Sequence, residues 1–296
     1  MACGFWRSAR SIFLLVASFI AHAATMHDDY LENLHDSFLG PSASLPEAET
    51  QAALTRRLTD FAAWIKQHEG EAHNTKLVLS SNARIHTQAS QAISSGQVIV
   101  YIPAFLTINS DDVRGTPYGA AAAKSWKRQK LLPGAEETAL LAVWLSKEAA
   151  FTRSSVYQPF FDLMPSSVFH LPAAFSPRHA RLLGLSQGIR DHLTKQFQET
   201  VHIVKCVHAF LIEIDSGIRS PRFDGVDLSA LAAWAVLMVQ TTALPYPRST
   251  SDDGEVLTLV PGISLVNHAH SSVANQPSAI FSRDPAGKIF VSSFVL

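Results

Sequence analysis

The sequence predicts an α+β protein in which small β-sheets are interrupted by a large all-helical insertion. Short apolar runs of β type lie on both sides of a long middle part, at 76–80 and 97–103 before it and at 256–261, 278–283 and 288–296 after it. The middle part instead carries apolar residues at helical spacing. We therefore expect strands, then roughly a hundred helical residues, then strands again.

The composition is that of a folded globular protein. Of 296 residues, 47% are hydrophobic and 17% charged, which is too apolar for a disordered chain. Lys and Arg number 24 against 25 Asp and Glu, and the net charge is -1. This balance excludes a strongly basic protein that binds nucleic acid by neutralising phosphates, so we expect no nucleic-acid partner.

Residues 1–24 are predicted to be a signal peptide or leader. Arg7 and Arg10 precede an apolar run at 12–20, and Ala21-His22-Ala23 has the small-x-small pattern of a cleavage site. The run is too short to span a membrane comfortably. An uncleaved anchor and an artefactual extension of the reading frame are alternatives. We expect the secretory route or an organelle if the leader is used, and the cytoplasm otherwise.

Two cysteines and several histidines raise the questions of disulfides and metal. Cys3 lies in the leader, so the mature chain would keep only Cys206 and no internal disulfide. The apolar neighbours of Cys206 predict an inert core thiol. On a helix His202 and Cys206 share a face but His208 does not, so we expect no metal site.

The helices are predicted in order along the chain. A capping box at 44–47 opens a first helix that ends at Gly70. An amphipathic helix is expected at 135–151, and another begins with Ser176 as cap and Pro177 in the first turn. A long helix is expected at 187–214. The apolar stripe of the first helix consists of Leu54, Leu58, Phe61 and Ile65.

A further helix, at 228–244, is apolar nearly all round, so a membrane span has to be weighed. Polar residues inside it, such as Gln240, and its borderline length favour a buried helix. We expect no stable membrane span once the leader is removed.

One segment carries the most information about function. Three common enzyme motifs are missing: the Gly-x-Ser-x-Gly elbow, the phosphate loop and the Gly-x-Gly-x-x-Gly fingerprint. The segment LVPGISLVNHAHSSVAN, at 259–275, places Asn267 and His268 directly after an apolar strand. Buried amides and imidazoles need hydrogen-bond partners there. Taken alone, the pair also fits an exposed turn.

Four segments follow the order of one known family. AISSGQVIVYIPAFLTI at 92–108 is similar to its early strand pair, and SVYQPFFDLMPSS at 155–167 to its Ser-x-Tyr/Trp-x-Pro-Tyr…Leu-Pro segment. The helix start at 175–193 and LVPGISLVNHA at 259–269 follow, the latter where the family has Leu-x-Pro-x-x-Asp-x-x-Asn-His-Ser. The chain thus resembles SET-domain methyltransferases of the Rubisco large-subunit lysine methyltransferase type, over most of residues 50–291.

This resemblance implies a domain organisation. After the signal peptide or leader predicted above at 1–24, residues 25–110 would hold the N-terminal helix and the first SET strands. Residues 111–250 form the helical insertion that splits the SET domain, and 251–296 form an incomplete second SET part.

The resemblance also implies an activity and a cofactor. The expected function is that of an S-adenosyl-L-methionine-dependent protein-lysine N-methyltransferase, with a protein substrate as partner and a monomeric chain. Asn267 and His268 would contact the cofactor, the Asn through its side chain and the His through its backbone. Asn275, Arg84 and Thr87 are additional candidates.

Several positions depart from the family pattern. The family's late tyrosine, which orients the lysine amine, has no counterpart after Asn267, so the catalytic residue stays unassigned. The residues 84–87 replace a Gly-x-Gly-Leu loop, Thr241-Thr242 a Ser-Arg pair, and Ser264 an Asp. A truncated chain, whose last strands would lack partners, and a degenerate relative are both open. So are two other functions: a non-catalytic SET-like protein-interaction module, and a secreted carrier of apolar ligands. The five tyrosines are Tyr30, Tyr101, Tyr118, Tyr157 and Tyr246.

Overall fold

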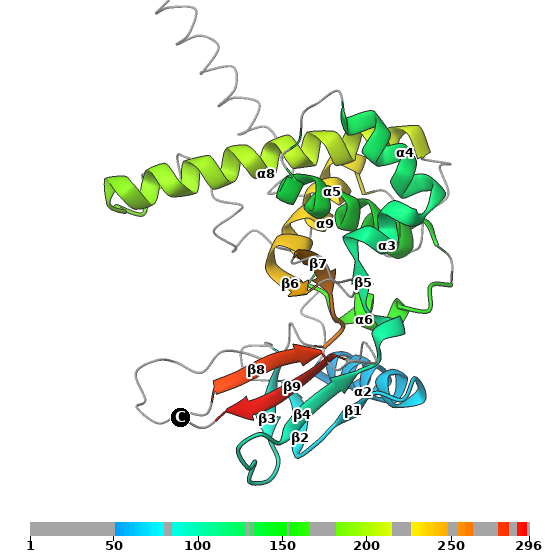
Figure 1. Cartoon of the computed structure of the whole chain (residues 1–296), viewed down its shortest axis with the longest axis vertical. Coiled ribbons are helices and arrows are strands. Elements are labelled where there is room, and N and C mark those ends of the chain that lie inside the picture. The colour runs from blue at the N-terminus through cyan, green and yellow to red at the C-terminus, as the bar shows by residue number, and fades with distance from the viewer. Residues whose placement is uncertain are drawn as a thin grey trace, which may run out of the picture.

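The structure, a computed structural model, has an α+β fold with two parts (Figure 1). One part is made of helices, and the other is a β-sheet with the helix α2 against it, so the predicted fold class is confirmed. The residues that the structure describes are 51–79, 85–127, 131, 133–152, 154–165, 182–214, 226–247, 254–262, 278–283 and 289–294.

Helix α2, Gln51–Gln67, is the predicted first helix. Its stripe is buried at Leu58, Phe61 and Ile65, whereas the predicted capping box lies outside the described residues. The helix ends where predicted, because the Gly70 N–H donates to the Ile65 carbonyl at 2.8 Å. A side chain at position 70 would place its Cβ 2.6 Å from the Cγ2 of Ile65, so only glycine allows this close return.

The larger sheet joins segments from both ends of the described chain. Its strand order is β1-β4-β9-β8, and every neighbouring pair is antiparallel. β4 precedes the helices and β9 follows them, and the two pair directly, with Tyr101 opposite Phe290. The expectation that the last strands lack partners is therefore wrong for β9, which is paired on both sides. The strands are β1 Glu71–Ala72, β4 Val98–Ile102, β8 Ser278–Arg283 and β9 Ile289–Phe294.

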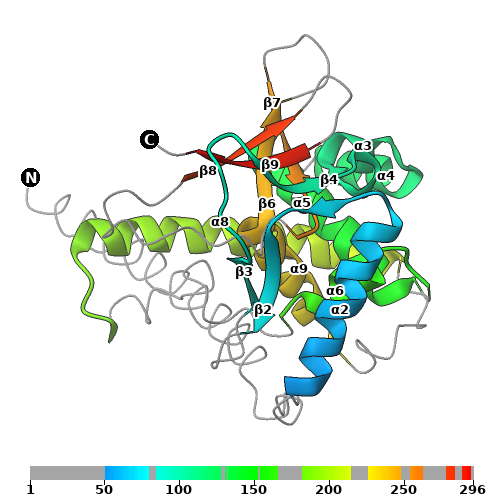
Figure 2. The same cartoon turned by 90° about the horizontal axis from the view of Figure 1, so that it is seen from below.

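A two-stranded ribbon lies beside α2, as Figure 2 shows from below. It consists of β2, Thr75–Leu79, and β3, Ile85–Ala89, paired antiparallel with Leu77 opposite Thr87. β2 was predicted and β3 was not. The sequence of β3, IHTQA, lacks the run of apolar residues by which β2 and β4 are recognised.

The third sheet lies next to the helices. Its strand order is β5-β7-β6, from Ile108–Asn109, Glu255–Leu259 and Ala243–Pro247. The helix expected to reach residue 244 ends at Thr242 instead, and the chain turns into β6. β6 contains two prolines and lies at the end of the sheet order, where missing N–H donors are tolerated.

The helical part lies between β5 and β6 in the chain. The helices predicted at 187–214 and 228–244 are found as α8 and α9, and Asp227 caps α9 by accepting from the Ser229 N–H. The helices are α3 Ser110–Gly115, α4 Pro117–Trp126, α5 Pro133–Ser146 with a π-helical turn at Lys147–Phe151, α6 Gln158–Leu163, α8 Gln187–Ile214 and α9 Leu228–Thr242.

Helix α5 is the centre of the helical part, and the prediction that it is amphipathic is wrong. Every residue from 139 to 146 is buried, because α3, α4, α8, α9 and β7 all contact the helix. Helix α9 is buried from Leu231 to Val239, as predicted. Among the described residues, no helix is both long and apolar enough to cross a membrane.

Candidate functional site

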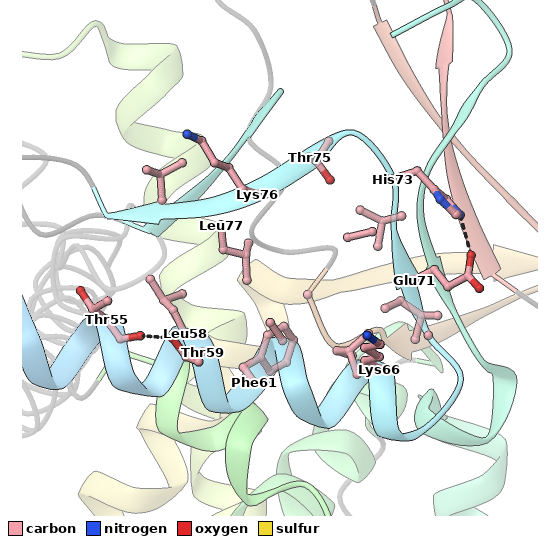
Figure 3. A pocket seen from close by; sticks show the side chains of 18 residues that line it. Thr55, Leu58, Thr59, Phe61, Lys66, Glu71, His73, Thr75, Lys76 and Leu77 are labelled. Atoms are coloured by element: carbon pink, nitrogen blue, oxygen red, sulfur yellow. Dashed lines mark hydrogen bonds and ion pairs between the residues drawn. The ribbon is translucent and has the colours of Figure 1, made fainter. Parts of the chain in front are cut away.

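A cavity of about 940 Å³ lies between α2 and the strands β1, β2 and β4 (Figure 3). We refer to it as the α2–β2 cavity. It is lined by Thr55, Leu58, Thr59, Phe61, Ala62, Ile65, Lys66, Gly70, Glu71, Ala72, His73, Thr75, Lys76, Leu77, Val78, Val100, Ile102 and Gly262.

The inner wall of the cavity is apolar. Successive turns of α2 present Leu58, Phe61 and Ile65, because these positions repeat at helical spacing. Strand β4 adds Val100 and Ile102, which are two residues apart and so lie on one face of the sheet. These side chains belong to the main hydrophobic core or pack against it, so the cavity lies at the edge of that core.

Polar groups lie among the remaining lining residues. The Glu71 carboxylate and the His73 imidazole are 2.7 Å apart, and both side chains are partly exposed. On α2 the Thr59 hydroxyl donates to the Thr55 carbonyl at 3.0 Å. Lys66 and Lys76, at exposed positions on α2 and β2, carry ammonium groups. The cavity therefore combines an apolar wall with groups of both charges.

Gly262 brings the C-terminal part of the chain to this cavity. It follows strand β7 in a turn and has a φ of +83°, a left-handed conformation that favours glycine. A Cβ at this position would lie 3.2 Å from the Cζ of Phe61 and 3.4 Å from its Cε1. The backbone at Gly262 thus lies directly against the Phe61 ring.

Most of the site residues predicted from the sequence lie outside the described residues. These are Asn267, His268, Asn275 and Arg84. The backbone of Thr87 is described: it lies in β3, opposite the cavity residue Leu77. The β2–β3 ribbon, which is next to Arg84 and contains Thr87, and the turn at 262, which precedes Asn267 and His268, both border the α2–β2 cavity.

The sequence interpretation missed the contribution of α2 to the cavity. Its apolar stripe was recognised as a core pattern, and the same side chains form the cavity wall. Glu71 and His73 belong to no motif, and only the pairing of β1 with β4 brings them to the rim. No pattern in the sequence marks them.

None of the described tyrosines is among the residues that line the cavity. Tyr157 belongs to an aromatic cluster, with its ring 5.1 Å from Trp144 and 6.2 Å from Trp64, and its hydroxyl donates to the Phe105 carbonyl at 3.3 Å. Burial, together with the nearby carboxylates of Glu148 and Asp112, raises the pKa of Tyr157 to about 12. The hydroxyl is therefore a neutral structural group at physiological pH.

Cys206 is buried in α8, as predicted for a core thiol. Burial raises the pKa of its thiol to about 11, so the reactive thiolate is disfavoured. In the described part of the chain, no group of three or more His, Cys, Asp or Glu side chains could hold a metal ion.

Solved structures give the clearest comparison. The SET domain of LSMT bound to lysine and AdoHcy matches at a TM-score of 0.58 and 18% identity, over 82% of this chain and 52% of that one. Rubisco LSMT bound to AdoMet matches at a TM-score of 0.54 and 19% identity, over 80% and 49%. The chain has the SET-domain fold of Rubisco LSMT. A complex of that enzyme with sinefungin and monomethyllysine matches at a TM-score of 0.53 and 18% identity, over 80% and 49%.

The SET-domain fold was predicted from segment order, and the structural likeness confirms it. The chain spans about half the length of the solved chains it matches. No protein-family model and no curated protein matches the sequence. The likeness is therefore one of fold, carried by the arrangement of elements at low sequence identity.

Proposed function

We propose that this chain binds S-adenosylmethionine at the α2–β2 cavity and transfers its methyl group to a lysine of a protein substrate. One observation carries the proposal: the chain has the fold of structures bound to AdoMet or AdoHcy and to lysine or methyllysine. The cavity is the candidate site because the ribbon that contains Thr87 and the turn five residues before Asn267 both border it.

The residues that line the cavity fit this cofactor. Its volume of about 940 Å³ is within the roughly 300–1,000 Å³ typical of small-molecule sites. S-adenosylmethionine carries an apolar-faced adenosine, a carboxylate, an ammonium and a sulfonium. The apolar wall suits the adenosine, the Glu71 carboxylate suits the cationic groups, and the Lys66 and Lys76 ammoniums suit the carboxylate.

Five residues are proposed as cofactor contacts. The Asn267 amide would bind the amino-acid part, and the His268 backbone would bind the adenine. Asn275, Arg84 and Thr87 are additional candidates. The position of Thr87 supports this set, because its partner in the ribbon is the cavity residue Leu77.

When bound, the cofactor supplies an electrophilic methyl group. The task of the protein is then to hold a neutral lysine amine in line with it and to exclude water. A free lysine has a pKa of about 10.4, so the neutral amine has to be favoured by desolvation. Leu77, Val78 and Val100, which line the cavity and are only half-buried, would give a lysine there the apolar surroundings that lower its pKa.

Calorimetry tests the proposal. S-adenosylmethionine titrated into the full chain should give a saturable heat, and the Asn267→Ala variant should bind about tenfold or more weakly because a charge-assisted hydrogen bond is lost. Asn109→Ser is the matched control: it also removes an asparagine amide, but it keeps a capping residue at the start of α3 and lies outside the cavity lining. Binding that is equal in all three proteins would contradict the assignment of Asn267.

A second candidate function is a non-catalytic protein-interaction module. It is favoured by the described tyrosines, because none of them is among the residues that line the cavity. Transfer of a labelled methyl group to protein lysine separates the two functions. Binding of S-adenosylmethionine without transfer to any protein of an extract would favour the module.

The leader is proposed to direct the chain into the secretory route or an organelle. Residues 1–24 fused to a fluorescent protein should leave the cytosol, whereas the same fusion with Arg7 and Arg10 changed to Glu should stay there. Cytosolic fluorescence from the unchanged fusion would contradict this location.

A further inference from the structure

Gly262 and Phe61 both line the α2–β2 cavity and are in close contact with each other. Among the lining residues that the structure describes, Gly262 alone comes from the chain after the helical part. It combines a left-handed φ of +83° with a close neighbour, because a Cβ there would be 3.2 Å from the Phe61 ring. Gly96 and Gly184 have similar φ values, of +77° and +63°, but a Cβ at either would meet nothing within 4 Å.

We propose that Gly262 is a positioning residue of the cavity: because it lacks a Cβ, the turn after β7 rests on the Phe61 ring and sets where that ring stands in the cavity wall. The consequence for ligand binding rests on the proposed function, in which the cavity holds S-adenosylmethionine. The geometry of the contact is independent of that function.

The Phe61 ring has little freedom to yield to an added methyl group. Its side chain is 3% exposed, and its ring centroid lies 5.6 Å from that of Trp64 on the same helix. Trp64 in turn packs against Tyr157, at 6.2 Å. The steric clash of a Cβ at position 262 with the Phe61 ring can therefore be relieved in two ways: the ring moves within the cavity wall, or the turn moves away from α2.

Either movement changes the cavity. A displaced ring changes the packing behind the apolar lining, and a displaced turn moves the backbone of Gly262, which itself lines the cavity. Gly262 has no side chain that could bind a ligand or transfer a proton, so it acts only through the position of Phe61 and of its own backbone.

The test compares Gly262→Ala with Gly96→Ala. Both substitutions place alanine in a left-handed conformation, so both bear the same backbone strain, but only the first presses on a neighbour. We expect Gly262→Ala to weaken binding of S-adenosylmethionine by fivefold or more, the lower end of the roughly 5–150-fold typical of coupled sites, and Gly96→Ala to leave it unchanged. Equal binding by the wild type and both variants would overturn the positioning role.

A second variant separates positioning from misfolding. Leucine ends at Cδ and lacks the Cε1 and Cζ atoms that the new Cβ would meet. In the double variant Phe61→Leu/Gly262→Ala, the loss of binding free energy should therefore be smaller than the sum of the losses in the two single variants. The double variant should fold even if Gly262→Ala does not. Strictly additive losses would show that Gly262 does not act through Phe61.

A ligand-free measurement keeps this inference distinct from the proposed function. In protein labelled with 5-fluorotryptophan, the fluorine resonance lost in Trp64→Phe reports on the ring beside Phe61. That resonance should shift in Gly262→Ala and not in Gly96→Ala. A shift in a chain that fails to bind S-adenosylmethionine would refute the proposed function and keep the positioning role, whereas an unshifted resonance would refute the claim that Gly262 sets where the Phe61 ring stands.

Discussion

Leu141 lies at the middle of α5, where its side chain has no exposed surface, and Leu141→Ala is expected to destabilise the whole chain. Each buried methylene contributes about 0.8 kcal/mol, so the three lost carbons account for about 2.4 kcal/mol. The cavity left behind raises the total to about 3–5 kcal/mol, because packed helices collapse only in part around it. At about 2 °C for each kcal/mol in a chain of this size, the midpoint of thermal unfolding should fall by about 6–10 °C.

Far-UV circular dichroism during heating measures this fall. Leu182→Ala is the matched control, since it makes the same chemical change at a position that is 76% exposed and should shift the midpoint by about 1 °C or less. A midpoint for Leu141→Ala within the error of the control would refute the argument. It would mean that α5 is not the packed centre that its contacts with α3, α4, α8, α9 and β7 indicate.

Three further predictions concern single positions. Asp227→Ala should lower the free energy of unfolding by about 0.5–2 kcal/mol at neutral pH in urea, because the carboxylate caps α9. Burial raises the pKa of Asp227, but hydrogen bonds from Ser229 and Ala230 outweigh this and lower it. The difference in unfolding free energy between wild type and variant should therefore be complete above the usual carboxyl pKa and disappear as the pH falls below it. Burial and nearby carboxylates raise the pKa of Tyr157 from its ordinary value of 10 to about 12. The stability that the neutral hydroxyl contributes should be complete below pH 10 and be lost as the pH rises through about 12. Absorbance titration should show an ionisation in this range that is missing in Tyr157→Phe. Gly70→Ala should cost about 1–3 kcal/mol by overpacking, and wild-type stability in that variant would show that the turn after α2 can move aside.

Elements with strong local patterns were predicted well. The apolar spacing of α8 places a helix at 187–214, and the structure has it at the same bounds. β4 and β7 were found because most of their residues are apolar and a proline follows each of them within two residues. In these segments the local preference and the final environment agree, so the sequence alone was enough.

The missed or wrong elements depend on tertiary contacts. β1 has only two residues and exists through its pairing with β4, and β6 forms in spite of two prolines because it pairs with β7 at a sheet edge. α5 looked amphipathic because Thr138 and Ser146 interrupt its apolar residues, yet both are buried. Polar residues on a helix mark its outer face only when that face is exposed to solvent, and at α5 other helices cover the face that carries Thr138 and Ser146.

The candidate site was predicted in part, for a similar reason. The pair Asn267–His268 was singled out because two polar side chains after an apolar strand need hydrogen-bond partners, and Gly262, which lines the cavity, lies five residues before Asn267 in the sequence. The wall on α2 could not be predicted. Phe61 and its neighbours on the apolar stripe of α2 have the spacing of a core helix, and that spacing does not show whether a cavity lies beside the helix.

Two contacts between distant segments decide whether this cavity exists. The pairing of β4 with β9 ties the C-terminal strands to the sheet that carries the cavity wall, and the turn at Gly262 rests on α2. More than 150 residues separate Phe61 from Gly262 in the sequence, and most of the intervening chain is the helical part. The helical part therefore contributes to the site by fixing where β7 ends, since β7 contacts α5 and continues into the turn. If this is correct, substitutions in the core of α5 should weaken ligand binding in proportion to their effect on the unfolding midpoint, whereas substitutions at Gly262 should weaken binding beyond it.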